Sequence, residues 1–179
     1  MVAGAVKKKR GGDRKWGEVR NSGAIGGSGA NNVPAADYPA ACLALGATIK
    51  TDRREIHADD FFIDMFETAL EDDEIITAVN FPTVEYANYQ KFPNPASRYA
   101  IVGVFVARRG PNVRVAVTGA GASVFRFSAA ERALESQFSV DSLKDVSCPA
   151  DELNDDLHAS AEYRAELVKV LTKRAIADA

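Results

Sequence analysis

Four β-rich runs between residues 86 and 127 constrain the fold of this chain more than any other feature. They are rich in β-branched and aromatic residues and follow one another after short breaks: Tyr86–Phe92, Tyr99–Arg108, Val113–Ala120 and Ser123–Phe127. Between the second and third runs, Arg109-Gly110-Pro111-Asn112 has the composition of a hairpin turn. The sequence therefore predicts an antiparallel meander.

Helical patterns follow this predicted sheet. We expect a helix from Ser128, as its N-terminal cap, through Leu134, a short helix at Val140–Val146, and a long one at Ala161–Ala177. In the last helix the apolar and charged residues fall mostly on opposite faces: Leu167, Val170, Leu171 and Ile176 against Arg164, Glu166, Lys169 and Lys173. Helices that follow a sheet and pack on it predict an α+β fold.

The part before residue 82 has shorter elements. Asn21–Asn31 is rich in Gly, Ser and Asn and predicts a loop, while Pro34, the helix formers of Ala35–Leu45 and Gly46 predict a short helix with its C-terminal cap. The remaining expected elements are strands at Ala47–Thr51, Glu55–His57 and Glu74–Phe81, and a short helix or turn at Asp59–Met65. Pro82 ends the last strand, and we expect a subdomain boundary near residues 82–86.

Charge is unevenly distributed along the chain. Residues 1–20 contain seven Lys or Arg and two acids, and the remainder contains 15 basic and 23 acidic residues. We interpret residues 1–15 as a basic, disordered leader. The acidic remainder argues against a nucleic-acid partner, which needs a basic face. No apolar run is long enough for a signal peptide or membrane span, so a cytoplasmic location is expected.

Few residues have the pattern of a metal or catalytic site. Cys42 and Cys148 are too few for a disulfide framework, and both are expected to be free thiols. His57 and His158 lie apart and fit neither a triad nor a metal site. We therefore predict no catalytic acid or base and no metal site.

The Gly23–Gly29 segment, with four glycines in seven residues, can bring backbone amides close to a ligand. It matches neither the G-x-G-x-x-G fingerprint nor the phosphate loop of nucleotide triphosphatases. On composition alone, a flexible turn without a ligand is the favoured interpretation.

Several segments carry a family pattern in the same order along the chain: Arg20–Ser28, Pro34–Pro39, Ala41–Leu45, Ala58–Phe62, Thr68–Glu71, Glu74–Thr77, Tyr89–Phe92, Ala100–Gly103, Ser160–Arg164 and Leu171–Ala175. Together they resemble the FAD-binding medium subunit of molybdenum hydroxylases, the carbon monoxide and xanthine dehydrogenase family. The resemblance runs from about residue 16 to the C-terminus.

The resemblance implies which residues contact FAD. In the order of the chain, they are Ala24, Ile25, Gly26, Gly27, Ser28, Asp37, Ile76, Lys91 and Tyr99. Taken without the resemblance, Asp37 is an acid favoured by a helix dipole and Ile76 a core residue of a strand. Lys91 would then be a solvated lysine of an edge strand, and Tyr99 a half-buried aromatic.

The resemblance also implies the fold and function. It predicts the remainder of an FAD-binding α/β subdomain at 16–84 and a C-terminal flavoprotein domain at 85–179, an antiparallel sheet packed with helices. In this family electrons pass from a molybdenum-cofactor large subunit through iron–sulfur clusters of a small subunit to FAD, and then to an external acceptor. The alternative is a non-enzymatic module that docks on those subunits without flavin.

Three departures from the family pattern bear on this interpretation. The family's first glycine-rich loop, of the A-G-G-x-S kind, has no counterpart here, so we expect a truncated chain or a separate polypeptide that carries this N-terminal half. Ala24 replaces the commonest residue, threonine. Arg98 occupies a position that is usually acidic, next to Tyr99.

Overall fold

The computed structural model describes residues 25–177, and it confirms the predicted meander. Strands β6 (Tyr86–Pro93), β7 (Ala100–Arg109), β8 (Asn112–Thr118) and β9 (Phe125–Arg126) form one antiparallel sheet in this order. Arg109 pairs with Asn112, so Gly110 and Pro111 form the two-residue turn between β7 and β8. The predicted basic leader, residues 1–15, lies outside the described residues.

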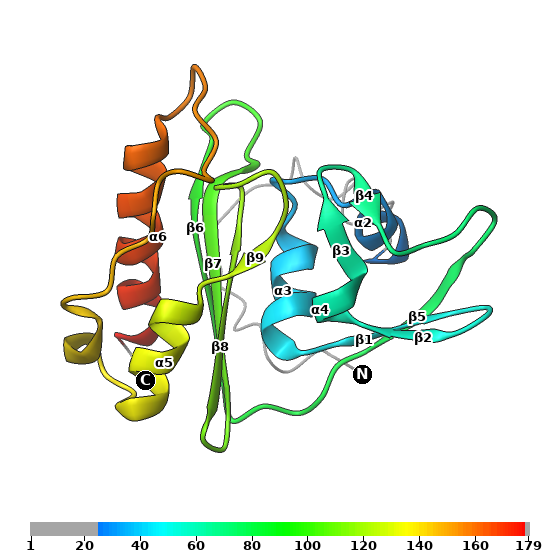
Figure 1. Cartoon of the computed structure of the whole chain (residues 1–179), viewed down its shortest axis with the longest axis horizontal. Helices are drawn as coiled ribbons and strands as arrows, with labels where there is room; N and C mark the ends of the chain where they lie inside the picture. The colour runs from blue at the N-terminus through cyan, green and yellow to red at the C-terminus, as the bar shows by residue number, and fades with distance from the viewer. Residues whose placement is uncertain (1–24, 178–179) are drawn as a thin grey trace, which may run out of the picture.

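Both faces of this sheet are covered (Figure 1). Helices α5 (Ser128–Ser136) and α6 (Ala161–Ile176), with the 3₁₀ helix η2 (Val140–Leu143), cover one face. Helix α3 (Asp37–Leu45) packs on the other face. Because neither face of the sheet meets water, the sequence of β7 is apolar almost throughout. Val104 and Val106 lie beneath α6, and Phe105 faces α3. The observed layers confirm the α+β prediction.

The remaining elements lie on the α3 side of the sheet (Figure 1). Strands β1 (Thr48–Thr51), β2 (Glu55–His57) and β5 (Ile76–Asn80) form an antiparallel sheet in the order β2-β1-β5. Helix α4 (Ala58–Phe61) leads into a hairpin of β3 (Phe62–Asp64) and β4 (Glu67–Thr68). The predicted strands at 47–51, 55–57 and 74–81 are thus confirmed within two residues, and the segment 59–65 divides between α4 and β3.

Local signals set the bounds of α3 and of β1. Gly46 adopts the left-handed conformation, with φ 64°, and its N–H bonds to the last turn of α3 as the predicted C-terminal cap. Beyond β1, the buried Glu74 carboxylate accepts hydrogen bonds from Arg54 Nε at 3.0 Å and from Thr51 Oγ1 at 2.7 Å. These bonds tie the β1–β2 turn to the segment that enters β5.

Two predictions about helices were wrong in detail. Ser128 is the first residue of α5 rather than its cap, and Phe127 occupies the cap position without a side-chain hydrogen bond. Arg164, which the helical pattern places on the polar face of α6, is only 3% exposed. Its guanidinium donates to the carbonyl oxygens of Ile101 and Gly119 at 2.7 and 2.9 Å, so it joins α6 to the ends of β7 and β8.

The prediction of a loop at Asn21–Asn31 was also wrong where the structure describes it. Ile25–Asn31 is a short helix, α2, that packs against β5. The glycines with positive φ among the described residues are Gly46, Gly110 and Gly119, so those within α2 are not used for left-handed backbone. Small residues allow α2 to approach the strand closely.

Candidate functional site

Asp37 is the best-defined polar group among the predicted site residues. It is the first residue of α3, where an acidic side chain interacts favourably with the helix dipole. Its Oδ1 accepts a hydrogen bond from the Tyr89 hydroxyl at 2.6 Å, and its Oδ2 accepts one from Lys91 Nζ at 2.8 Å. The carboxylate side chain is still 47% exposed, so it remains open to a further hydrogen-bond donor.

Strand β6 supplies both partners of Asp37. Tyr89 and Lys91 are two residues apart and therefore lie on the same face of the strand. The Tyr89 ring stacks on Phe105 of β7, with ring centroids 5.9 Å apart. Burial and then the negative charge of Asp37 raise the pKa of the Tyr89 hydroxyl well above its usual value, so it stays protonated and donates.

The segment before Asp37 is fixed to the C-terminal sheet. Gly119 N donates to Pro34 O at 2.8 Å, and Thr118 Oγ1 lies 2.9 Å from Pro34 O and 2.7 Å from Ala36 O. Gly119 has φ 80°, where a Cβ would lie 2.8 Å from Ile101 O, so only glycine fits. The start of α3 is thus held by β8, and the position of Asp37 depends on the C-terminal sheet.

A second group of predicted residues meets at α2 and β5. A Cβ on Gly26 would lie 3.7 Å from Ile76 Cβ, and one on Gly29 would lie 3.7 Å from Ile76 Cδ1. Gly27 has open space around it, with nothing within 4 Å of a Cβ placed there. The structure therefore brings the glycine segment and Ile76 together, with Ile25 and Ser28 in the same short helix. Ala24 lies outside the described residues.

Tyr99 stands in the connection between β6 and β7, one residue before β7 begins. The residue is 52% exposed. The preceding residue, Arg98, has φ 64°, and the following one, Ala100, donates its N–H to Ala35 O at 3.4 Å. Tyr99 thus lies at the end of the sheet that holds the segment before Asp37, and no interaction of its side chain assigns it a role.

The two histidines and two cysteines lie outside these groups. His57 Nδ1 lies 3.1 Å from the Asp59 carboxylate, and His158 Nδ1 lies 3.4 Å from Asn94 Nδ2. Cys42 is buried and Cys148 half-buried, both as free thiols. Within residues 25–177, no group of three or more His, Cys, Asp and Glu residues could hold a metal ion.

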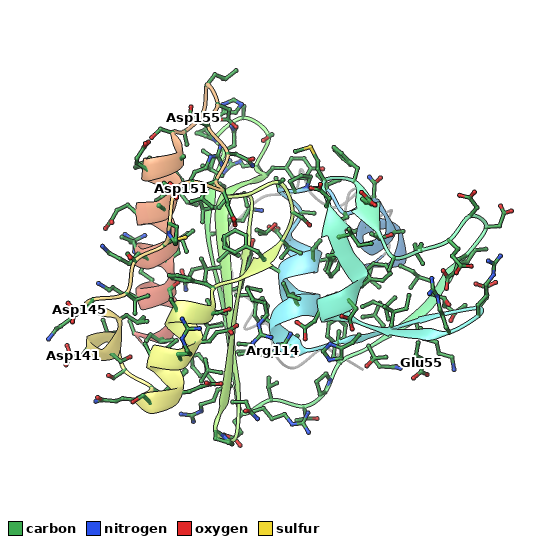
Figure 2. The ribbon with its side chains drawn as sticks, in the orientation of Figure 1. Glu55, Arg114, Asp141, Asp145, Asp151 and Asp155 are labelled. Atoms are coloured by element: carbon green, nitrogen blue, oxygen red, sulfur yellow. The ribbon has the colours of Figure 1, made fainter. Side chains whose placement is uncertain are left out.

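Arg114 lies at the end of α3 opposite to Asp37. Figure 2 shows Arg114 at the lower end of α3, where its Nε donates to Leu43 O at 2.9 Å and its guanidinium pairs with Asp59. It also shows Asp141 and Asp145 at the left edge of the view, and Asp151 and Asp155 further up, in the segment that leads into α6. None of the helices in the described part is long and apolar enough to cross a membrane.

The sequence matches two family profiles that together span most of the chain. Residues 16–84 match the FAD binding domain in molybdopterin dehydrogenase, and residues 87–179 match the CO dehydrogenase flavoprotein C-terminal domain. The chain belongs to the CO dehydrogenase flavoprotein family. FAD is the cofactor of this family's binding domain, which confirms the cofactor prediction.

Two similar curated proteins are named as the medium subunit or medium chain of an enzyme. The chain is 35% identical over 176 residues to the nicotine 6-hydroxylase medium subunit of Paenarthrobacter nicotinovorans, covering 90% of this chain and 62% of the relative. It is 32% identical over 173 residues to the glyceraldehyde dehydrogenase medium chain of Sulfolobus acidocaldarius, covering 88% and 62%. The chain thus spans about three fifths of the length of these relatives.

Solved structures agree with the fold. Carbon monoxide dehydrogenase from Hydrogenophaga pseudoflava matches with a TM-score of 0.73 and 26% identity, over 90% of this chain and 62% of that one. Quinoline 2-oxidoreductase from Pseudomonas putida 86 matches with a TM-score of 0.74 and 24% identity, over 90% and 62%. The latter likeness supports the fold alone.

The residues around Asp37 fit the chemistry of FAD. The cofactor presents hydroxyl groups that donate hydrogen bonds, a charged pyrophosphate and flat aromatic rings. Asp37 offers a partly exposed carboxylate acceptor, Lys91 a cation and Tyr99 an exposed aromatic ring. The family resemblance predicted these three residues and did not include Tyr89, although its spacing of two from Lys91 places both on one strand face.

Proposed function

We propose that this chain is the FAD-binding, electron-transfer component of a molybdenum hydroxylase complex. The observation that carries the proposal is the contact of Asp37 with Lys91, two predicted FAD ligands that lie 54 residues apart in the sequence. Family membership supports the cofactor, and the partly exposed carboxylate supports a role in binding.

In this proposal the two groups of residues hold different parts of the cofactor. Asp37 accepts hydrogen bonds from hydroxyl groups, and Lys91 supplies positive charge beside it. Gly26, Gly27 and their neighbours in α2 bring the main chain near the ligand, with Ile76 as an apolar contact behind them. Ala24 and Tyr99 complete the proposed set. Bound FAD supplies the redox chemistry, and the protein positions it and sets its electrostatic surroundings.

The proposed partners follow from the named relatives, which are medium subunits of multi-subunit enzymes. We propose a large subunit with a molybdenum cofactor and a small iron–sulfur subunit from which electrons reach FAD before an external acceptor. A separate polypeptide with the family's first glycine-rich loop is a further proposed partner. A cytoplasmic location, a leader at 1–15 and a boundary at 84/85 also remain proposals.

A second candidate is an assembly module that docks on those subunits without flavin. The chain spans about 62% of the length of two of its curated relatives.

Titration of the purified chain with FAD separates the two candidates. Visible absorption bands that become shifted and structured, with a Kd below about 10 μM or roughly −7 kcal/mol, support the flavoprotein. A spectrum that stays that of free flavin up to about 100 μM protein contradicts it and leaves the assembly module.

A further inference from the structure

Gly103 interrupts the apolar run of β7 for a steric reason. A glycine inside a strand weakens it, and often marks a place where another group comes close. A Cβ at Gly103 would overlap the Tyr89 hydroxyl oxygen and lie 2.9 Å from Thr118 Cγ2. Gly103 thus leaves the space in which the Tyr89 hydroxyl lies.

The Tyr89 side chain connects the C-terminal sheet to the first residue of α3. Its ring is held by stacking on Phe105, a residue of the buried core beneath α3. From this fixed ring the hydroxyl reaches Asp37 Oδ1 at 2.6 Å. A tyrosine ring has few rotatable bonds, so this hydrogen bond orients the carboxylate at a small cost in side-chain entropy.

Tyr89 and Lys91 act differently on Asp37. Lys91 is a cation on a flexible side chain, and it neutralises part of the carboxylate charge. The Tyr89 hydroxyl is neutral, so it orients the carboxylate without removing its charge. An ionised carboxylate has about four acceptor sites, and among the described residues only these two donors occupy any of them, which leaves sites for hydroxyl groups of a ligand.

We propose that Tyr89, in the space left by Gly103, is a positioning residue that orients the Asp37 carboxylate for binding of FAD hydroxyl groups. This inference rests on the proposed FAD binding. Tyr89 is not itself a proposed FAD contact; it acts through Asp37.

The first test compares the FAD affinity of the full chain with that of Tyr89→Phe, which removes only the hydroxyl. Tyr86→Phe is the matched control, because Tyr86 also lies on β6 and donates to a carbonyl, Ala175 O, on the opposite face. We expect Tyr89→Phe to raise the Kd about five- to tenfold, as for the loss of a hydrogen bond to a charged group. Tyr86→Phe should leave it within about twofold.

The second test asks whether the effect passes through Asp37. In an Asp37→Ala background, Tyr89→Phe should raise the Kd by no more than about twofold, because the group that it orients is gone. A fivefold loss that persists in this background would overturn the proposal, since it would give Tyr89 an effect independent of Asp37.

The outcomes separate this inference from the proposed function. If the wild-type chain binds FAD and Tyr89→Phe binds it equally well, the role of Tyr89 is wrong and the flavoprotein assignment stands. If the wild-type chain does not bind FAD, both fail. Far-ultraviolet circular dichroism and urea midpoints of each variant establish that the fold is retained.

Discussion

Replacing Arg164 by methionine tests how the buried guanidinium holds α6 on the sheet. The side chain is 4% exposed, and it bonds to two backbone carbonyl oxygens, those of Ile101 and Gly119. Its third partner, Asp156 Oδ2 at 2.8 Å, belongs to a side chain that is 43% exposed. Methionine keeps much of the buried length but offers no donor.

The magnitude follows from the groups left without partners. Each buried carbonyl that loses its donor costs about 1 to 3 kcal/mol. Part of this is offset because a charge no longer has to be held in a buried site. The exposed bond to Asp156 contributes little by comparison. We expect Arg164→Met to lower the free energy of unfolding by about 2 to 4 kcal/mol.

Urea unfolding followed by circular dichroism measures this change. For an m-value of about 2 kcal/mol/M, the midpoint should fall by about 1 to 2 M. Lys169→Met is the control on the same helix, since its ion pair with Glu166 at 3.0 Å is partly exposed and contributes less than about 0.5 kcal/mol. An Arg164→Met midpoint equal to that of the control would refute the reasoning.

Three further changes have defined outcomes. Gly119→Ala should destabilise the protein by more than about 3 kcal/mol in urea unfolding, because φ is 80° and a Cβ would overlap backbone oxygens at the start of β7. The hydrogen bond from Arg54 lowers the pKa of Glu74 from 4.5 to about 2, so its contribution to stability is present above about pH 4.5 and lost as the pH falls towards 2. Over this pH range, the free energy of unfolding should fall less steeply with decreasing pH for Glu74→Gln than for the wild-type protein. Burial raises the pKa of the Cys42 thiol to about 12, so alkylation of the native protein at pH 8 should modify Cys148 first, as mass spectrometry of the peptides will show.

Local sequence chemistry predicted much of the fold. The Gly-Pro turn before Asn112 and the Gly46 cap depend on residues next to one another, so their composition is informative without any tertiary contact. The order of the four strands follows from short connections, since neighbouring strands joined by short turns pair antiparallel.

Other features depend on partners that are distant in the sequence. Arg164 looks like a solvated residue in the helical pattern, because its acceptors lie 45 and 63 residues away. The glycine segment looks like a loop because glycine favours turns, but packing of α2 on Ile76 makes part of it helical. Tertiary contact overrides local preference in both cases.

The candidate site also combines residues that the sequence predicted with one whose role depends on a distant partner. The family resemblance selected Asp37 and Lys91, whereas the role of Tyr89 depends on where Gly103 lies beside it in the sheet. A mid-strand glycine in an apolar run was the signal in the sequence. Only the strand register reveals which side chain uses the space.

FAD binding by the wild-type chain and by Asp37→Ala tests the proposed flavin site most directly. Asp60→Ala is the control, because Asp60 is likewise an exposed acid in the first turn of a helix, α4. We expect the wild-type chain and Asp60→Ala to bind FAD with the same Kd and Asp37→Ala to bind it at least tenfold more weakly, with unchanged circular dichroism. Equal affinity of all three proteins would contradict the assignment of Asp37, and with it the proposed flavin site.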